Sequence, residues 1–350
     1  MPLEEPRWWY DVGGSRLAEK LLGPVSEIYG RVVERRFKAA QPYRSDIPVI
    51  CVGNFTAGGT GKTPLTRFLV GLLAEQGVEP VCLTRGYGGT LAGPVWVDAN
   101  THSAEEVGDE PLLIANTARV VVARDRKAGL KAIADEGRAG AVIMDDGLQN
   151  PSLAKAMSIA VVDATRGFGN GRVIPAGPLR ARFDFQLGLV DCIVVMGADP
   201  PSGPSPIFET LKKRFPGPVL RGAVSPSGDA GWIAGQPVLA YAGIANPGRF
   251  FRLVESLGAA SIVERAFPDH HAFSEAEAAQ LVAEAERTGA QLVTTEKDLA
   301  RLAGAKGARS RLASLSRTLP IEVRFEERDL VRLRALVDGA LKAAPVPSKD

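Results

Sequence analysis

The sequence has few cysteines and almost no net charge, and each shortage narrows the possible functions. Its three cysteines, Cys51, Cys82 and Cys192, lie far apart in apolar stretches of the 350-residue chain. They form neither a zinc-binding spacing nor a disulfide framework, so we expect buried core residues in a reducing cytoplasm. The net charge of +2 disfavours a broad nucleic-acid-binding surface, and no obligatory protein partner is evident.

Long apolar runs are also missing. The longest stretch without a charged residue, 230–248, contains two prolines and four glycines, so it cannot be a simple membrane-spanning helix. Glu4, Glu5 and Arg7 precede any apolar stretch, which is not typical of a secretory signal. A length of 350 residues favours two domains with sizeable cores.

Residues 1–46 differ in pattern from the rest of the chain. An aromatic cluster, Trp8 to Tyr10, precedes a helical pattern that Pro24 is expected to break. One face of this pattern is apolar, with Leu17, Leu21, Val25, Ile28 and Val32. Its end is basic, with Arg31, Arg35, Arg36, Lys38 and Arg44. Two interpretations stay open at this point: a helix lying on an anionic membrane surface, or an amphipathic helix packed on its own domain.

From residue 47 onward, strand and helix patterns alternate, which predicts an α/β fold with a mostly parallel sheet covered by helices on both faces. Strands are expected at 48–52, 80–83, 119–123, 141–144, 159–162 and 192–196, with helices near 64–76, 105–117 and 126–136. Residues 199–237, rich in proline and glycine, are expected to connect to a second, smaller α/β unit. Its strands are expected near 238–242, 291–294 and 321–324, and its helices near 248–257, 275–287 and 330–341. We therefore predict segments 1–46, 47–225 and 226–350.

A glycine-rich loop follows the first of these strands and precedes a helix. Successive backbone N–H groups of such a loop can surround phosphate oxygens, while a lysine reaches the β- and γ-phosphates and a threonine hydroxyl ligates Mg²⁺. The helix that follows directs its N-terminus at the same anion. A glycine usually opens this pattern, and Thr56 takes that place here. The predicted nucleotide-binding residues are Thr56, Ala57, Gly58, Gly59, Thr60, Gly61, Lys62 and Thr63.

Three further groups could carry chemistry beside the loop. Asp145 and Asp146 follow an apolar strand, where a Mg²⁺-organising carboxylate belongs, although two aspartates in a turn can also act as caps. Asp109 lies at an expected helix start, which acidic residues favour for structural reasons alone. His270 follows Asp269, so it could orient a base or transfer a proton, or it could be a surface loop histidine.

Together these pieces resemble one family, the tetraacyldisaccharide 4′-kinases of lipid A biosynthesis. The resemblance spans about residues 9–302, with the motifs in the same order. They are the loop 58–64 and the segments 85–88, 108–111, 145–149, 166–171, 175–180, 267–271 and 294–298. Any single motif has low specificity, but their co-occurrence in order is highly specific.

The resemblance implies transfer of the ATP γ-phosphate to the 4′-hydroxyl of a tetraacylated disaccharide 1-phosphate at the cytoplasmic face of the inner membrane. It implies a P-loop domain and a smaller domain that holds the substrate head group between them. Asp109, assisted by His270, would activate the hydroxyl, with Lys62 on the phosphates. The candidate Mg²⁺ ligands are Thr63, Glu110, Asp145 and Asp146. The candidate substrate-binding residues are Asn54, Arg85, Arg126, Gln149, Arg180 and His271.

Two positions depart from the family pattern. Asn150 stands where the family usually has histidine, and Gly89 where it often has arginine, so a necessary role for either side chain is doubtful. Two other functions are alternatives. A P-loop ATPase switch is disfavoured because Ala57 occupies the place of its signature lysine. A kinase acting on a soluble sugar is disfavoured by the amphipathic N-terminal segment.

Overall fold

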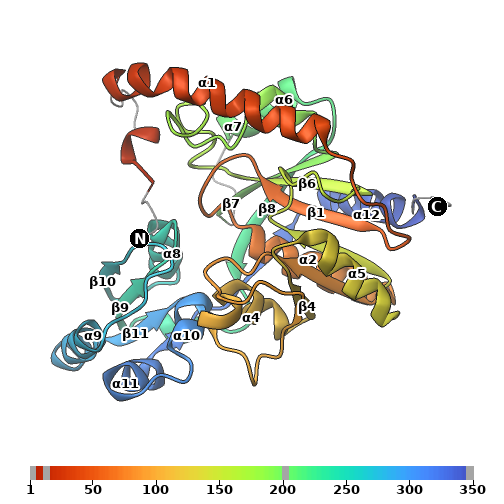
Figure 1. Ribbon diagram of the computed structural model, residues 1–350. Helices are drawn as coiled ribbons and strands as arrows, with labels where there is room; N and C mark the ends of the chain where they lie inside the picture. Colours follow the sequence, from red (N-terminus) through yellow and green to blue (C-terminus); the bar gives the residue numbers. More distant parts are fainter. Residues whose placement is uncertain (1–4, 11–15, 199–204, 344–350) are drawn as a thin grey trace.

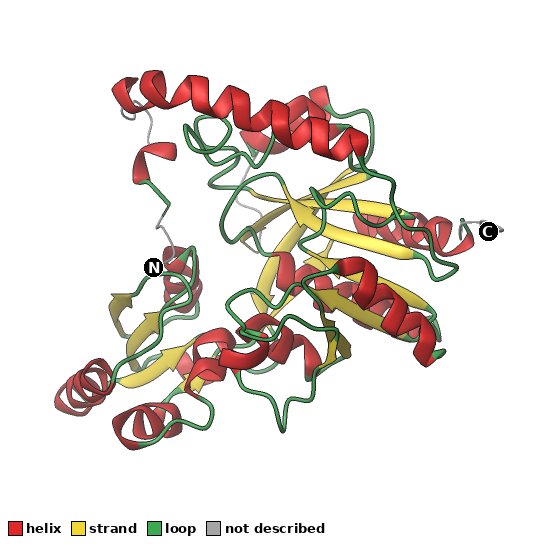
Figure 2. Cartoon of the chain, in the orientation of Figure 1, coloured by secondary structure: helices red, strands yellow, loops and turns green. Residues whose placement is uncertain are grey.

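The computed structural model describes residues 5–10, 16–198 and 205–343. These residues form two units, each built on its own sheet (Figure 1). The larger unit holds nine strands in the order β13-β8-β7-β6-β1-β5-β2-β4-β3, and the smaller holds four in the order β10-β9-β11-β12. Figure 2 distinguishes the two sheets as separate groups of strands. The predicted α/β class is confirmed.

The large sheet is parallel except at its two edges. Strand β13 pairs antiparallel with β8, and β3 pairs antiparallel with β4. The apolar central strands are buried along their whole length, as expected for a parallel sheet covered on both faces. The strands are β1 Val49–Asn54, β2 Pro80–Thr84, β3 Val95–Trp96, β4 Arg119–Val122, β5 Ala141–Asp145, β6 Met157–Asp163, β7 Cys192–Ala198, β8 Val219–Pro226 and β13 Ile321–Phe325.

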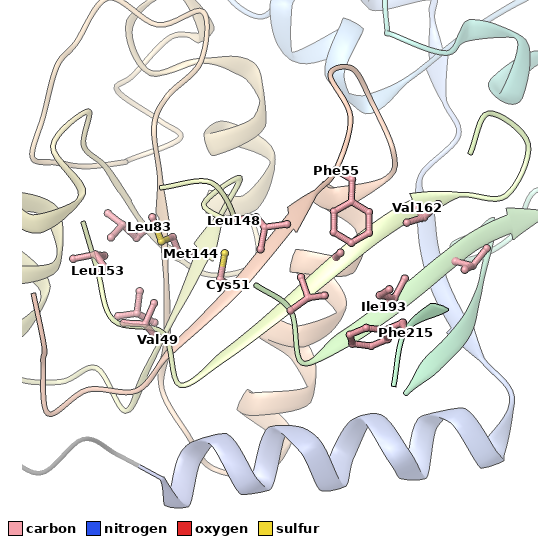
Figure 3. Packing of buried hydrophobic residues seen from close by; sticks show 14 of the residues in the cluster. Val49, Cys51, Phe55, Leu83, Met144, Leu148, Leu153, Val162, Ile193 and Phe215 are labelled. Carbon is pink, nitrogen blue, oxygen red and sulfur yellow. The ribbon is translucent and has the colours of Figure 1, made fainter. Parts of the chain in front are cut away.

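Helices cover both faces of this sheet. On one face lie α2 (Lys62–Glu75) and α12 (Glu327–Lys342), whose leucines and valines pack on β1, β5 and β6. On the other lie α5 (Arg126–Glu136) and α7 (Pro206–Arg214). Figure 3 shows side chains of this second core, among them Phe55, Leu148 and Ile193. The remaining helices of the unit are α1 Arg16–Ala39, α3 Ala104–Val107, α4 Asp109–Ala115, α6 Phe183–Leu187 and the short η1 Arg7–Trp9.

The small unit is a four-stranded, wholly parallel sheet with helices on both faces. A reciprocal capping box between Ser274 and Glu277 starts α9, and Gly289 ends it in the left-handed region. The elements are η2 Gly231–Ile233, β9 Pro237–Ala242, α8 Pro247–Ser256, β10 Ser261–Ala266, α9 Glu275–Thr288, β11 Gln291–Thr294, α10 Glu296–Leu302, α11 Gly307–Leu315 and β12 Arg317–Thr318.

The end of the chain does not belong to the small unit, contrary to the predicted segment 226–350. Strand β13 pairs with β8 in the large sheet, and α12 buries Leu333 and Val337 in the large core. The small unit is therefore an insertion between β8 and β13, whose connecting segments meet where the Ser227 N–H donates to the Pro320 carbonyl at 2.8 Å. The apolar pattern of a strand predicts its existence but not the sheet it joins. Strand β8 itself lies in the stretch predicted to be only a connection.

Helix α1 is unbroken from Arg16 to Ala39, so the predicted break at Pro24 is wrong. Its packed side makes polar and apolar contacts: Ser26 accepts a hydrogen bond from the Ala176 N–H, Glu34 pairs with Arg182 at the start of α6, and Phe37 packs edge-on against Phe185. Its apolar side faces outward, with exposed Leu17, Leu21, Val25, Ile28, Tyr29 and Val32. The helix lies along one margin of the molecule (Figure 1). The helix is thus packed on its own unit, while the apolar residues named from the sequence face outward.

Candidate active site

A cleft with a volume of about 1860 Å³ is lined by residues of both units. Parallel strands direct their carboxyl ends to a common edge, and the loops after β1, β2, β5, β6 and β7 all contribute to this cleft. From the small unit come residues after β9, β10 and β11. The site thus lies where the loops of the large sheet face the inserted unit.

The phosphate loop connects β1 to α2. Gly61, with a φ of 92°, is the residue before the helix and takes a left-handed conformation that favours glycine. Its neighbours from Ala57 to Thr63 line the cleft. Thr60 is buried, and its hydroxyl has no hydrogen-bond partner among the described residues. An orphaned hydroxyl in a glycine-rich loop at a helix N-terminus suits a bound anion.

Asn54 and Thr56 lie beneath the loop rather than on the cleft. Asn54, at the end of β1, is fully buried and donates from Nδ2 to the Gly58 carbonyl at 3.1 Å. Thr56 is buried and pairs with Leu179 through an isolated β-bridge. Gln149 lines the cleft, but its Nε2 is engaged by the Asn54 carbonyl at 2.7 Å. These three side chains shape the loop from below.

Acidic residues gather at the end of β5. Thr63 Oγ1 lies 3.1 Å from Glu110 Oε1, and Thr66 Oγ1 lies 3.3 Å from Asp145 Oδ1. Burial and the neighbouring carboxylates of Glu110 and Asp146 raise the pKa of Asp145. Burial is the larger cause, and a cation would offset both the desolvation of this carboxylate and its repulsion by its acidic neighbours.

Asp146 and Lys62 lie beside that cluster. Asp146 pairs with Lys62 at 3.5 Å and with Arg180 at 2.8 Å. Although burial acts in the opposite direction, these two cations hold the pKa of Asp146 well below its usual range. Arg180 also donates from Nε to the Thr56 carbonyl at 3.0 Å, so one guanidinium joins the phosphate loop to the β5 end.

Asp109 begins α4 and is directed across the cleft at the small unit. Gly108, with a φ of 93°, permits the sharp break between α3 and α4, and a Cβ there would lie 2.6 Å from the Tyr87 carbonyl. Asp109 is 3% exposed, and its Oδ2 lies 3.3 Å from His270 Nδ1. Burial is outweighed by His270 and Arg301, which hold the pKa of Asp109 far below its usual range. It is therefore an ionised carboxylate at neutral pH.

Asp146 and His270 share an unusual backbone conformation. In the described part of the chain they are the only residues other than glycine with a positive φ, 50° and 57° respectively. Such conformations are strained for residues with a Cβ and persist where the surrounding structure enforces them, which is frequent at functional sites. Both lie on the cleft, one on each unit.

The remaining predicted residues divide between the cleft and its support. Arg85 is exposed and lines the cleft. Arg126 is buried and donates to the carbonyls of Ala123 and Asp145, at 2.7 and 3.2 Å, so it holds the ends of β4 and β5. His271 is not among the lining residues. It bonds Glu277 at 3.1 Å and stacks on Phe267, so its position does not support the predicted substrate contact.

The two departures from the family pattern have local explanations. A Cβ on Gly89 would lie 2.7 Å from the Glu106 carbonyl oxygen, so the backbone leaves no room for a side chain there. Asn150 accepts hydrogen bonds from the N–H and the hydroxyl of Ser152, at 2.8 and 2.6 Å. Its amide therefore shapes its own turn while it lines the cleft.

Sequence reasoning missed four charged residues at the site. On the small unit, Arg301 binds Asp109, and Lys297 binds Glu110. Arg249 pairs with the buried Asp163 at 3.5 Å. Glu5, near the start of the chain, pairs with Arg166 at 3.2 Å, and its carboxylate adjoins Gly58 of the phosphate loop. The motif 294–298 weakly indicated Arg301 and Lys297, because α10, which carries both residues, begins within it. Nothing in the sequence pattern pointed to Arg249 or Glu5.

The fold and this site define a P-loop phosphotransferase: a parallel sheet with a phosphate loop, a lysine, two adjacent aspartates after β5 and a carboxylate–histidine pair between the two units. The sequence pattern of the family Tetraacyldisaccharide-1-P 4′-kinase matches residues 18–339. The chain belongs to this family. Its fold, its ATP-dependent kinase function and its place in lipid A biosynthesis are confirmed as predicted.

Individual relatives agree over nearly the whole length. The Tetraacyldisaccharide 4′-kinase of Methylobacterium nodulans is 46% identical over 99% of this chain and 98% of its own. That of Rhodopseudomonas palustris is 46% identical over 98% of this chain and 97% of its own. The crystal structure of the "apo" form of LpxK from Aquifex aeolicus in complex with ATP gives a TM-score of 0.71 at 23% identity. It covers 93% of this chain and 100% of that one, and it supports the fold.

Proposed function

We propose that this kinase transfers the γ-phosphate of ATP to the 4′-hydroxyl of tetraacyldisaccharide 1-phosphate, with Asp109 accepting the hydroxyl proton. The new bond joins the hydroxyl oxygen to the γ-phosphorus, the bond to the bridging oxygen breaks, and ADP leaves. The observation that carries the proposal is the Asp109–His270 pair, at 3.3 Å: His270 lines the cleft of a P-loop fold, and the buried Asp109 contacts it from the large unit. A nucleotide switch has no need of an ionised carboxylate placed there.

Each residue has a defined part in the proposed transfer. Lys62 and the loop amides hold the β- and γ-phosphates, which is positioning and charge neutralisation rather than covalent chemistry. His270 donates to Asp109 and keeps one carboxylate oxygen oriented. Arg301 also donates to Oδ2 of Asp109. Two side chains of the small unit therefore fix the orientation of the Asp109 carboxylate. Base catalysis of this kind contributes about 10²–10⁴-fold.

The donor set around Thr63 fits Mg²⁺. Mg²⁺ is held in such enzymes by one or two carboxylates, a hydroxyl, phosphate oxygens and water, rather than by a cage of protein ligands. Within the described ranges no group of three or more histidine, cysteine or acidic side chains forms such a cage. We assign Thr63 and Asp145 as the direct ligands, with Glu110 and Asp146 behind them. When bound, the ion would neutralise charge on the β- and γ-phosphates.

The acceptor's acyl chains suggest how α1 serves the reaction. Among described residues, no helix is long and apolar enough to cross a bilayer. The outward apolar face of α1, together with exposed arginines toward its end, suits a helix that lies in the headgroup region of an anionic membrane. We therefore place the enzyme peripherally on the cytoplasmic face of the inner membrane, with α1 as its contact.

One assay tests the transfer. The full chain is incubated with γ-labelled ATP, Mg²⁺ and the lipid disaccharide 1-phosphate, and a labelled lipid is expected. Release of label only as inorganic phosphate would contradict the proposal. A disaccharide 1-phosphate without acyl chains, run in parallel, separates a lipid kinase from a kinase of soluble sugars, because the latter would label both acceptors equally. Chelation of Mg²⁺ is expected to stop transfer, and unchanged transfer would remove the metal assignment.

A second assay tests the membrane contact. The double variant Leu21→Glu with Ile28→Glu places two charges on the exposed face of α1, where both side chains are more than 60% exposed. It is expected to lose flotation with vesicles containing phosphatidylglycerol. Val331→Glu is the matched control, because this valine is also exposed, at 55%, but lies on α12. Flotation of the double variant equal to that of the control would count against the contact.

A further inference from the structure

Arg249 is a charged side chain of the small unit that lies beside the phosphate loop. It lies in the first turn of α8, which starts at Pro247. Its Nη1 is 3.5 Å from the point where a Cβ on Gly61 would sit. A Cβ on Gly59 would similarly lie 3.0 Å from the Ala245 Cβ. The small unit therefore touches the loop at two glycines, and one of these contacts brings a guanidinium.

The guanidinium has unused hydrogen-bonding capacity. Arginine carries five N–H donors. Within the described chain, Arg249 donates one long hydrogen bond, from Nη2 to the Gly197 carbonyl at 3.4 Å, and pairs with Asp163 at 3.5 Å. Asp163 Oδ1 is already engaged by the N–H groups of Thr165 and Arg166, at 2.8 and 2.9 Å. Both contacts of Arg249 are longer than an ordinary hydrogen bond, so most of its donors remain open to an anion.

The phosphate loop has a complementary shortage. The first turn of a helix offers free N–H groups to a bound phosphate. Here the third residue of α2 is Pro64, which has no N–H, so that turn offers one donor fewer. An arginine beside Gly61 can supply the missing donor together with a full positive charge, and it can bind two phosphate oxygens at once.

We propose that Arg249 is a nucleotide-binding residue, which contacts the phosphate chain of ATP from the small unit. This inference rests on the proposed phosphate-binding role of the loop. Because Arg249 is on the insertion and Lys62 is on the large sheet, a nucleotide held by both would tie the two units together. Asp163 keeps the guanidinium in place before the nucleotide arrives. Arg301 and His270 form a second contact between the units, on Asp109.

The test measures nucleotide affinity directly, by calorimetric titration of the full chain with ATP and with ADP in Mg²⁺. Arg249→Ala is expected to weaken binding at least tenfold, which corresponds to about 1.4 kcal/mol. Arg249→Lys keeps the positive charge but loses the planar guanidinium that donates two hydrogen bonds at once. Its nucleotide Kd should lie between those of Arg249→Ala and wild type. KM for the lipid acceptor should be unchanged. Arg265→Ala is the matched control. Arg265 lies on the exposed edge strand β10 of the same unit, and it pairs with Glu284 of α9.

Two outcomes would overturn the proposal. One is a nucleotide Kd of Arg249→Ala within twofold of wild type. The other is a fall in melting temperature together with a rise in KM for both substrates, which would show that the Arg249–Asp163 pair only joins the units. Failure of the proposed function gives a different result: the wild-type chain would then release label only as inorganic phosphate, whatever Arg249→Ala does to the nucleotide affinity.

Discussion

On one wall of the cleft, the phosphate loop presents backbone N–H groups from consecutive residues at the end of β1. On the other wall, the small unit presents side chains from three separate segments: Arg249 on α8, His270 after β10 and Lys297 on α10, with Arg301 behind them on Asp109. The first wall is built by local chain geometry, since glycines such as Gly61 turn the backbone inward. The second exists only when the inserted unit is folded and docked, so its chemistry depends on tertiary structure.

The largest expected effect comes from removing the cation of the first wall. Lys62→Ala should lower kcat on the order of 10³-fold or more, because a positioned charge on the transferred phosphate is lost. Transfer of label from γ-labelled ATP measures it, and circular dichroism checks that the fold remains. Lys213→Ala, on the exposed side of α7, is the control. If Lys62→Ala kept wild-type turnover, the loop would not be the phosphate site.

The base lies between the two walls, and its removal should be nearly as severe. Asp109→Asn is expected to lower kcat by about 10²–10⁴-fold, with KM for ATP within a few-fold of wild type. Glu105→Gln, an exposed residue on the neighbouring α3, is the control. Wild-type turnover in Asp109→Asn would refute the assignment.

A double-mutant cycle sharpens this comparison. If Asp109 and His270 act as a unit, adding His270→Ala to Asp109→Asn should lower kcat little further, because residues that act together are not additive. If the two losses multiply instead, His270 has a separate task on the second wall, such as direct contact with the acceptor.

The two walls also differ in how far sequence could predict them. The strand–loop–helix order around Lys62 and the aspartates after β5 are contiguous patterns, so the first wall could be read along the chain. The family resemblance supplied Asp109 and His270, although they are 161 residues apart. Arg301 and Arg249 belong to no local sequence pattern. Only the packing of α10 on α4 and of α8 against the phosphate loop brings these two side chains to the site. The membership of β13 in the large sheet was missed for the same reason: strand pairing is not local.

The contact between Asp109 and His270 can be measured through the pKa of His270. Burial lowers the pKa of His270, but the hydrogen bond and charge of Asp109 outweigh burial, so the pKa is raised. NMR titration should therefore place it above about 6.5, and Asp109→Asn should lower it. The free energy by which this pair stabilises the fold is fully present below the pKa that His270 has in the unfolded chain. It is lost as the pH rises through the higher pKa of His270 in the folded protein. A pKa unchanged by Asp109→Asn would contradict the pairing.

The smallest effect on activity is expected for His271, the neighbour that sequence reasoning also assigned to the substrate. Its ring stacks on Phe267 with centroids 4.9 Å apart and bonds Glu277, so it supports the start of α9 rather than the cleft. His271→Ala should leave kcat and both KM values within about twofold of wild type while it lowers stability by roughly 1.5–3 kcal/mol, the usual contribution of a hydrogen bond to a charged group. His270→Ala should differ in catalysis, with a clear loss of kcat. Measured side by side, the two adjacent histidines separate a residue that faces the other wall from one that only holds its own unit together. Equal losses of kcat in both variants would mean that the loop 267–271 works as one element, and that the position of His271 outside the cleft does not decide its role.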